Sequence, residues 1–272
     1  TCALPICETS EIINDFLLDA PPGEFKQCAA AMTCIVSNKK LVESSISKTE
    51  KQWNHQQYTP VTINDHTAMI CDESMVGDER YIDPVLNQVF KYNISKKSMK
   101  LLNETVNGSS LRNAIQARIN EYALETYGEN FAAGAYDVPN ESNKVVVIMR
   151  SSSVSLSNYR TGIVIGRYII DSENKKVEGS IKTQQHFFEN GNAMSKFETN
   201  INNDLIGNSD DEIADSFIQE ISKFETSFYD EYLLGLLKIG AEGLNHLRRK
   251  LPITASKINW EQELTTGSAM QI

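Results

Sequence analysis

The sequence contains no apolar run long enough to cross a membrane. Its longest aliphatic stretches, such as residues 145–149, are far shorter than the roughly 20 residues of a spanning helix. No N-terminal stretch has the basic-then-apolar form of a secretory signal peptide. The five cysteines are irregularly spaced without a Cys-x-x-Cys pair, so neither a zinc site nor a disulfide framework is indicated. We therefore expect a cytosolic protein with reduced thiols.

The usual spacings of catalytic and phosphate-binding motifs are also missing. The four histidines form no His-x-x-x-His or His-Glu-x-x-His pair, and Gly-x-Gly-x-x-Gly, Walker A and Gly-x-Ser-x-Gly spacings are absent. His66 and Cys71 stand five residues apart, but a catalytic dyad at that spacing would be a coincidence. We expect no enzyme, no cofactor and no bound metal.

What is present is an ordinary globular composition over 272 residues, with 40% hydrophobic and 23% charged residues and a formal charge of −10. Such a length can bury a self-sufficient core in one or two domains. Residues 9–58 show helical spacing broken at Pro21-Pro22, so we expect short antiparallel helices that include 24–36 and 42–57. Over residues 58–92 the pattern indicates brief strands with turns, and residues 93–108 are polar and predict a loop.

The second half of the chain predicts an antiparallel sheet with helices packed on it. A helix is expected over 109–127, and a long helix follows the Ser209-Asp-Asp-Glu212 capping box over about 208–240. Turn residues separate the β segments, which favours a meander over βαβ units and an α+β class. The expected strands are 131–136, 145–150, 159–170, 177–188 and 193–201. The apolar stripe of the long helix consists of Ile213, Phe217, Ile221, Phe224 and Phe228.

Positive charge is concentrated near the end of this acidic chain. Arg248, Arg249, Lys250 and Lys257 stand within the run 246–260. A positive island in a negative protein predicts an oriented contact with an acidic protein partner. Two other interpretations stay open: the arginines contact nucleic-acid phosphates, or they merely solvate the end of a helix. The charge of −10 argues against the nucleic-acid interpretation.

This basic run resembles the C-terminal motif of the actin filament capping protein alpha subunit family, which reads roughly Leu-Arg-Arg-x-Leu-Pro-Val-Thr-Arg-x-Lys-Ile-x-Trp. Five further segments resemble the family in order and spacing: 20–25, 57–61, 80–84, 158–162 and 185–192. The resemblance implies a single capping-protein alpha domain over residues 1–272. Its parts are a helical stalk (9–58), a small β globule (59–106), a helix with the central sheet (107–203), the long helix (208–240) and a basic C-terminal tentacle (244–272).

The resemblance also implies a function. The chain would pair with a capping protein beta subunit as an obligate heterodimer, bind actin filament barbed ends without calcium, and block subunit exchange in the cytoplasmic cytoskeleton. Inhibition by phosphoinositides is implied, but no stable membrane insertion and no nucleic-acid binding. The implied actin-binding residues are Arg248, Arg249, Lys250, Lys257, Ile258, Trp260 and Leu264.

Several positions depart from the family pattern. Asn245 and Ala255 stand where the family usually has lysine and arginine, and residues 160–168 lack the usual tryptophans. The last residues, 265–268, are poor helix formers. From these departures we expect a barbed-end affinity that is reduced, or shifted toward a divergent actin or an actin-related filament. Two alternatives stay open beside capping of actin: a subunit that caps an actin-related minifilament in a dynactin-like assembly, or a phosphoinositide sensor that uses the basic run at membranes.

Overall fold

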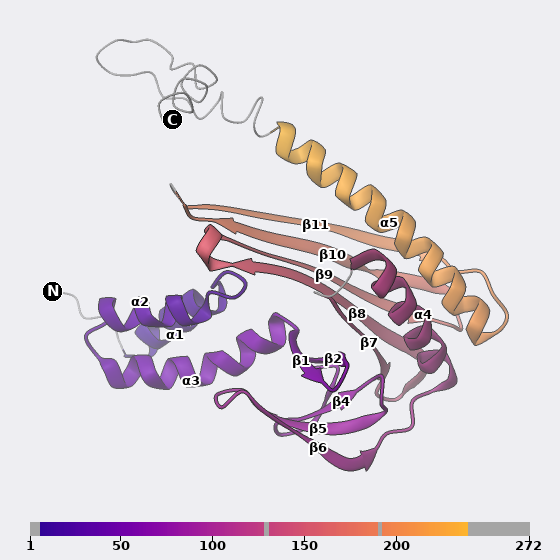
Figure 1. Cartoon of the computed structure of the whole chain (residues 1–272), viewed down its shortest axis with the longest axis horizontal. Coiled ribbons are helices and arrows are strands. Elements are labelled where there is room, and N and C mark those ends of the chain that lie inside the picture. Colours follow the sequence, from indigo (N-terminus) through magenta and orange to yellow (C-terminus); the bar gives the residue numbers. More distant parts are fainter. Residues whose placement is uncertain (1–5, 128–130, 190–191, 239–272) are drawn as a thin grey trace, which may run out of the picture. The chain divides into compact units, whose positions relative to one another are not determined.

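The computed structural model describes residues 6–127, 131–189 and 192–238 of the chain (Figure 1). The chain divides between Phe224 and Glu225, inside helix α5, into two compact units. The predicted mixture of helices and antiparallel sheet is confirmed. That the whole chain is a single domain stays a prediction.

Three helices at the N-terminal end of the first unit pack on one another, and this three-helix bundle is called the stalk below. The first helix ends shortly before Pro21-Pro22, where proline removes a backbone donor. Trp53 lies on the buried side of the bundle, as predicted: its ring centroid is 5.2 Å from that of Phe25, and its Nε1 donates to the Ala20 carbonyl at 3.2 Å. The helices are α1 (Ile6–Leu18), α2 (Phe25–Ile35) and α3 (Lys39–Gln56).

Residues 59–105 form a two-stranded and a four-stranded antiparallel sheet. The predicted loop over 93–108 is wrong, because residues 98–105 pair with the preceding strand. This strand is at the edge of its sheet and most of its side chains are exposed, so its sequence lacks apolar alternation. The strands are β1 (Thr59–Ile63), β2 (His66–Ile70), β3 (Met75–Gly77), β4 (Arg80–Asp83), β5 (Gln88–Asn93) and β6 (Ser98–Thr105).

The central sheet is a meander of five antiparallel strands in the order β11-β10-β9-β8-β7, as predicted. Strand β8 is longer than expected, because Ser151–Ser155 continue it beyond Arg150. Serine is not a strong strand former, but this segment is held in register opposite 160–164 of the next strand. The strands are β7 (Phe131–Val138), β8 (Glu141–Ser155), β9 (Arg160–Asp171), β10 (Lys176–Phe187) and β11 (Ala193–Asp204).

Helix α4 (Ser110–Tyr127) and residues 210–224 of α5 (Asp210–Lys238) cover one face of this sheet (Figure 1). Ile213, Phe217 and Ile221 of the predicted stripe are buried in that layer, with Phe224 partly buried beside them. One of the two hydrogen bonds of the predicted capping box is confirmed, and the other has a different partner. Ser209 Oγ accepts from the Glu212 amide at 3.3 Å, but the Glu212 carboxylate reaches back to the Asn208 amide at 2.7 Å.

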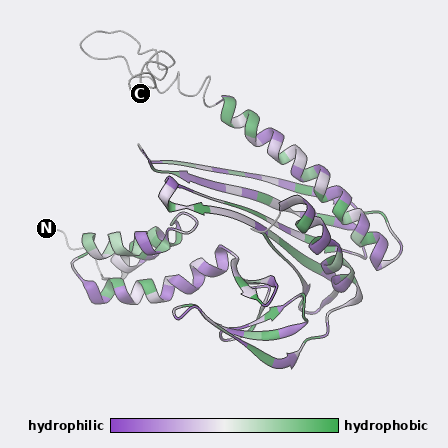
Figure 2. Ribbon diagram, in the orientation of Figure 1, coloured by the Kyte–Doolittle hydropathy of each residue, from purple (hydrophilic) through white to green (hydrophobic). Residues whose placement is uncertain are grey.

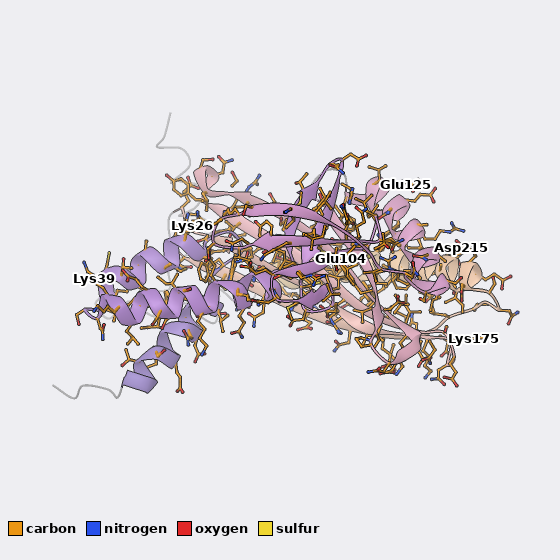
Figure 3. The ribbon with its side chains drawn as sticks, turned by 90° about the horizontal axis from the view of Figure 1, so that it is seen from below. Lys26, Lys39, Glu104, Glu125, Lys175 and Asp215 are labelled. Atoms are coloured by element: carbon orange, nitrogen blue, oxygen red, sulfur yellow. The ribbon has the colours of Figure 1, made fainter. Side chains whose placement is uncertain are left out.

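Charged side chains lie on the outside of these layers. The six labelled in Figure 3 (Lys26, Lys39, Glu104, Glu125, Lys175 and Asp215) are all exposed. Across the described part of the chain, no helix is both long enough and apolar enough to span a membrane.

Candidate functional site

The basic and apolar residues predicted to bind actin lie outside the described residues. Arg248, Arg249, Lys250, Lys257, Ile258, Trp260 and Leu264 all follow Lys238, the last described position. Their assignment therefore stays a prediction. The described residues offer two other surfaces suited to contact with a protein: the edge of the central sheet at β11, and the end of α5.

Strand β11 is one of the two edge strands of the central sheet, and its backbone orientation can be read from its pairing. The register with β10 runs without a shift from Lys176↔Asp204 to Phe187↔Ala193. The Leu205 amide continues this ladder by donating to the Lys175 carbonyl at 2.7 Å. Successive residues of a strand point their backbone groups to opposite sides. Odd-numbered residues of β11 therefore face β10, and even-numbered residues present N–H and C=O groups to the open edge.

The side chains of β11 also alternate between two faces. Ile201 belongs to the core under α4 and α5, so odd-numbered side chains lie on that face. Lys196 and Glu198 lie on the opposite face, where they line a groove of about 500 Å³ together with Leu18 and Tyr58 at the base of the stalk. The edge thus presents a lysine and a glutamate on one face, two residues apart.

A buried polar cluster joins the stalk to the same face of the sheet. Glu24 and His186 are 8% and 6% exposed, and Glu24 Oε1 lies 2.7 Å from His186 Nδ1. The Thr161 hydroxyl donates to the same carboxylate oxygen at 2.7 Å, and Asn192 Oδ1 lies 2.8 Å from His186 Nε2. A buried charged group without such partners would be strongly destabilising. The cluster therefore ties the start of α2 to β9 and β10.

A buried arginine makes a second junction with the stalk. Arg150 of β8 donates through Nε to the Gln57 carbonyl at 2.9 Å and through Nη1 to Ser152 Oγ at 2.9 Å. Burial lowers the pKa of this guanidinium to about 10. Nearby, Arg167 of β9 pairs with Glu73 at 2.8 Å. These contacts are made on the same face of the sheet as the side chains of Lys196 and Glu198.

The second unit contributes the end of α5 to the described residues. Leu233, Leu234 and Leu237 are 56%, 56% and 69% exposed, and Figure 2 shows this end of the helix as rich in hydrophobic residues. Just before them, the rings of Phe228 and Tyr232 stack with centroids 6.4 Å apart. Exposed leucines close together on one helix end are typical of a surface that binds another protein.

The residues that could suggest catalysis are used structurally. His66 Nε2 lies 2.7 Å from the buried carboxylate of Asp83, and Cys71 contacts Ser74 instead of a histidine. Burial raises the pKa of the Cys71 thiol to about 12, which keeps it protonated and unreactive at neutral pH. Within residues 6–127, 131–189 and 192–238, no group of three or more histidine, cysteine, aspartate or glutamate side chains is placed to hold a metal ion.

Sequence reasoning missed the residues of the stalk junction and of the sheet edge. Glu24 and His186 are 162 positions apart, and no local pattern links them. Lys196 and Glu198 carried a usable signal, since polar side chains recur at every second position along 196–204. That signal predicts an exposed strand face but does not identify which strand ends the sheet.

Comparisons with known proteins agree with this fold. A family model described as F-actin capping protein alpha subunit matches residues 13–269. The chain is 27% identical over 256 residues to the F-actin-capping protein subunit alpha of Saccharomyces cerevisiae, covering 92% of this chain and 91% of that protein. The corresponding Neurospora crassa protein is also 27% identical, over 257 residues with 93% and 92% coverage.

A solved structure extends the likeness to three dimensions. The structure described as the homodimeric actin capping protein alpha subunit from Plasmodium berghei matches with a TM-score of 0.70. It is 18% identical in sequence and covers 91% of this chain and 98% of that one. At this identity the match supports the fold alone.

Proposed function

Because the chain belongs to the F-actin capping protein alpha subunit family, we propose that it caps actin filament barbed ends as one half of a heterodimer with a beta subunit. Capping would block subunit addition and loss by occupying the filament end, without catalytic turnover and without calcium. The protein would act in the cytoplasmic cytoskeleton, and phosphoinositides would inhibit it through the basic residues.

The observation that carries this proposal is the open β11 edge in a chain of this family. Even-numbered residues such as Met194, Lys196 and Asn200 point their backbone groups away from β10. Unpaired edge groups favour the addition of another strand. We infer that a strand of the beta subunit pairs there and extends the sheet, and that the exposed leucines of α5 are covered in the heterodimer.

The C-terminal residues would make the filament contact. Arg248, Arg249, Lys250 and Lys257 would guide docking on acidic actin surfaces, because charge acts mainly on encounter rate and orientation. Exposed ion pairs contribute about 0.2–1 kcal/mol each, whereas nanomolar binding requires about 12 kcal/mol. Ile258, Trp260 and Leu264 are therefore proposed as apolar anchors, alongside contacts from the beta subunit.

The test is seeded actin elongation from barbed ends with the heterodimer purified after co-expression. We expect the double variant Arg248→Glu, Arg249→Glu to slow capping at least about tenfold at low salt, since favourable charge steering becomes repulsive. The matched control is Lys39→Glu, Lys40→Glu, which makes the same charge change at two exposed positions of α3. Equal capping rates for the two double variants would contradict the assignment. The capping rate should be the same in the presence of calcium and in the presence of a calcium chelator.

The remaining alternative, a subunit that caps an actin-related minifilament, follows from Asn245 and Ala255 in place of basic residues. A pull-down from native extract separates the two. Recovery of actin with the heterodimer supports filament capping, whereas recovery of motor-complex components in place of actin supports the alternative.

A further inference from the structure

We propose that the four-stranded sheet β3-β4-β5-β6 carries a docking surface for an acidic α-helix of another protein. The surface is built on a row of three cations that crosses the strands: Arg80, Lys91 and Lys100, called the basic row below. Two further lysines, Lys96 and Lys97, stand at the adjoining β5–β6 turn. None of these residues belongs to the β11 edge or to the C-terminal basic run, so the inference goes beyond the capping function proposed above and does not depend on it.

The pairing of the strands places the three cations directly opposite one another. Arg80 of β4 pairs with Lys91 of β5, and Lys91 pairs with Lys100 of β6. Directly opposite residues of an antiparallel pair point their side chains to the same face of the sheet. The next position along each strand lies on the other face, in a hydrophobic core, and these residues are Tyr81, Phe90 and Leu101. The basic row therefore lies on the face turned away from that core, where β4, β5 and β6 run side by side (Figure 1).

The basic row does not stabilise the sheet that carries it. Like charges directly opposite on neighbouring strands are unfavourable, and the row contains two such pairs in succession. Two carboxylates offset part of this repulsion, since Glu104 pairs with Arg80 and Glu79 Oε2 lies 3.4 Å from Lys91 Nζ. Lys100 has no ion pair with any residue that the structure describes. An acidic partner would remove the remaining repulsion.

The β5–β6 turn holds two more cations beside the row. Lys96 and Lys97 are exposed, and within the described part of the chain neither has an ion pair. The Lys96 amide donates to Asn93 Oδ1 at 2.8 Å, and the Lys97 amide donates to the Ile94 carbonyl at 3.2 Å. Lys97 has a φ of 50°, a backbone conformation that favours glycine or asparagine. The backbone therefore gives no reason for a lysine here, and its charge is available to a partner.

The spacing of the row fits a helix better than an extended strand. Neighbouring strands lie about 4.8 Å apart, so three directly opposite side chains span about 10 Å across the sheet. On a helix, carboxylates at positions i, i+3 and i+7 lie on one face and span about 10.5 Å. On an extended strand, three side chains on one face span about 13 Å. The occupant is therefore a helix whose axis runs across the strands, with one carboxylate opposite each cation.

The first experiment titrates the purified full-length protein with a fluorescent helical peptide of about 16 residues. The peptide is rich in alanine and glutamine and carries glutamates at i, i+3 and i+7. Fluorescence anisotropy at low salt measures binding, and every protein carries Arg248→Gln and Arg249→Gln to weaken binding of the probe by the C-terminal basic run. Each exposed ion pair changes the association constant about 1.4- to fivefold. We expect Lys91→Gln with Lys100→Gln to weaken binding between about two- and 25-fold.

Two matched controls separate the basic row from the general charge of the protein. Lys175→Gln with Lys176→Gln removes the same charge at another exposed turn, where Lys175 also has a φ of 50°, and should leave binding unchanged. A peptide of the same composition, with its glutamates spread around the helix, should bind more weakly than the probe to the protein with an intact row.

The second experiment identifies which carboxylate faces which cation. Lys91 is at the centre of the row and Lys100 is at one end. We expect Lys91→Glu to prefer a peptide with lysine at the central position, i+3, over the original probe. Lys100→Glu should instead prefer a peptide with lysine at i or i+7. Peptides that bind both variants equally would show that no defined register exists between the row and a helix.

The outcomes decide between the interpretations. Weakening confined to the row variants, together with the two preferences for exchanged charges, supports the proposal. Equal binding of the probe by row and control variants overturns it. So does binding to vesicles of phosphatidylcholine and phosphatidylserine that is lost in the row variant while the probe is not bound, because the surface would then recognise a membrane. Thermal melts by circular dichroism show that the variants fold. Seeded actin elongation is a separate measurement, so failure here leaves the proposed function standing.

Discussion

On β7, one edge strand of the central sheet, other parts of the chain bond the outward backbone groups of Ala135, whereas no such bond from a described residue is found along β11, the other edge strand. The Ala135 amide donates to Gln116 Oε1 at 2.7 Å, and the Ala135 carbonyl accepts from Arg112 Nε at 3.0 Å. No comparable side-chain caps are recorded for the backbone of Met194, Lys196, Glu198 or Asn200 in the described part of the chain. Burial follows the same division, since most of β7 is buried and most of β11 is not.

This difference indicates that the chain protects the β7 edge of the sheet itself, and that the β11 edge is the one suited to pairing with another strand. Met69 and Cys71 pack against Ala132 and Tyr136, so the β1–β2 hairpin covers the β7 side of the sheet in addition to the caps from α4. A sheet edge left open invites further strands, and folded proteins usually protect it. One sheet therefore contains a protected edge and an open edge, and the open edge is the one that we assign to assembly.

The largest effect is expected from Glu198→Pro. The N–H of residue 198 points out of the sheet, so proline removes a donor to the partner strand while the β10–β11 ladder keeps its own bonds. We expect loss of the beta subunit during co-purification, with affinity reduced on the order of 100-fold, and a melting temperature of the chain close to the wild type.

The matched control for this change is Thr199→Pro, one residue along the strand. The N–H of residue 199 points toward β10, so this variant should lower the melting temperature. If Glu198→Pro bound the beta subunit as tightly as the wild type, β11 would not be the assembly edge.

A smaller but substantial effect is expected from Arg112→Met on the protected side. Arg112 is 3% exposed and also donates to the Pro84 carbonyl at 2.7 Å, so methionine would leave two buried carbonyls without these donors. We expect the free energy of unfolding to fall by about 2–4 kcal/mol in urea titrations. Arg118→Met, on the same helix but exposed in its pairing with Asp215, should change it much less than Arg112→Met does. Similar losses in both variants would show that Arg112 does not cap the β7 edge.

The loss of stability at alkaline pH should report on the region where Cys71 packs against β7. Burial raises the pKa of Cys71 from 9.0 to about 12, so above pH 9 the unfolded chain loses this proton while the folded chain keeps it. Folded chains then bind more protons than unfolded ones, and stability falls as pH rises from 9 toward 12. The slope is up to about 1.4 kcal/mol per pH unit from this thiol.

Urea titrations between pH 8 and pH 10.5 test this contribution. Cys71→Ala should make the alkaline fall less steep, whereas Cys34→Ala should leave it unchanged because Cys34 is exposed. Burial also raises the pKa of Tyr81 to about 12, so part of the slope should remain in both variants. Identical slopes in the wild type and in Cys71→Ala would mean that this region opens before global unfolding.

How much of this comparison could be predicted from the sequence depends on the range of the interactions. Strand periodicity and turn residues were enough to predict the meander, because antiparallel neighbours are also neighbours in sequence. The apolar spacing of Ile213, Phe217 and Ile221 predicted a packed helix for the same reason. Both patterns are formed by residues that are close together in the sequence.

Local sequence patterns could not predict which side chains bond the backbone of β7, nor which strand forms the open edge of the sheet. Gln116 and Ala135 meet only after α4 folds back on the sheet, and β6 was mistaken for a loop because its exposed side chains conceal the strand. The basic residues around Arg248 were identified through family resemblance and net charge, and their geometry lies outside the described residues. The candidate site was thus predicted by resemblance at the C-terminal end and found by structure at the sheet edge.

The smallest effect is expected from Asp19→Asn, and it tests whether β11 is free to accept a partner. Asp19 and Lys196 form an ion pair of 2.6 Å with side chains 71% and 52% exposed. Because solvent screens such a pair, its removal should change the free energy of unfolding by less than about 1 kcal/mol, with a still smaller effect at high salt. Urea titrations at two ionic strengths measure this, with Lys51→Met as a control for another exposed pair, to Asp78. A loss above about 2 kcal/mol would mean that Lys196 is needed to hold the stalk. The weaker result leaves its charge available to whichever strand pairs with β11.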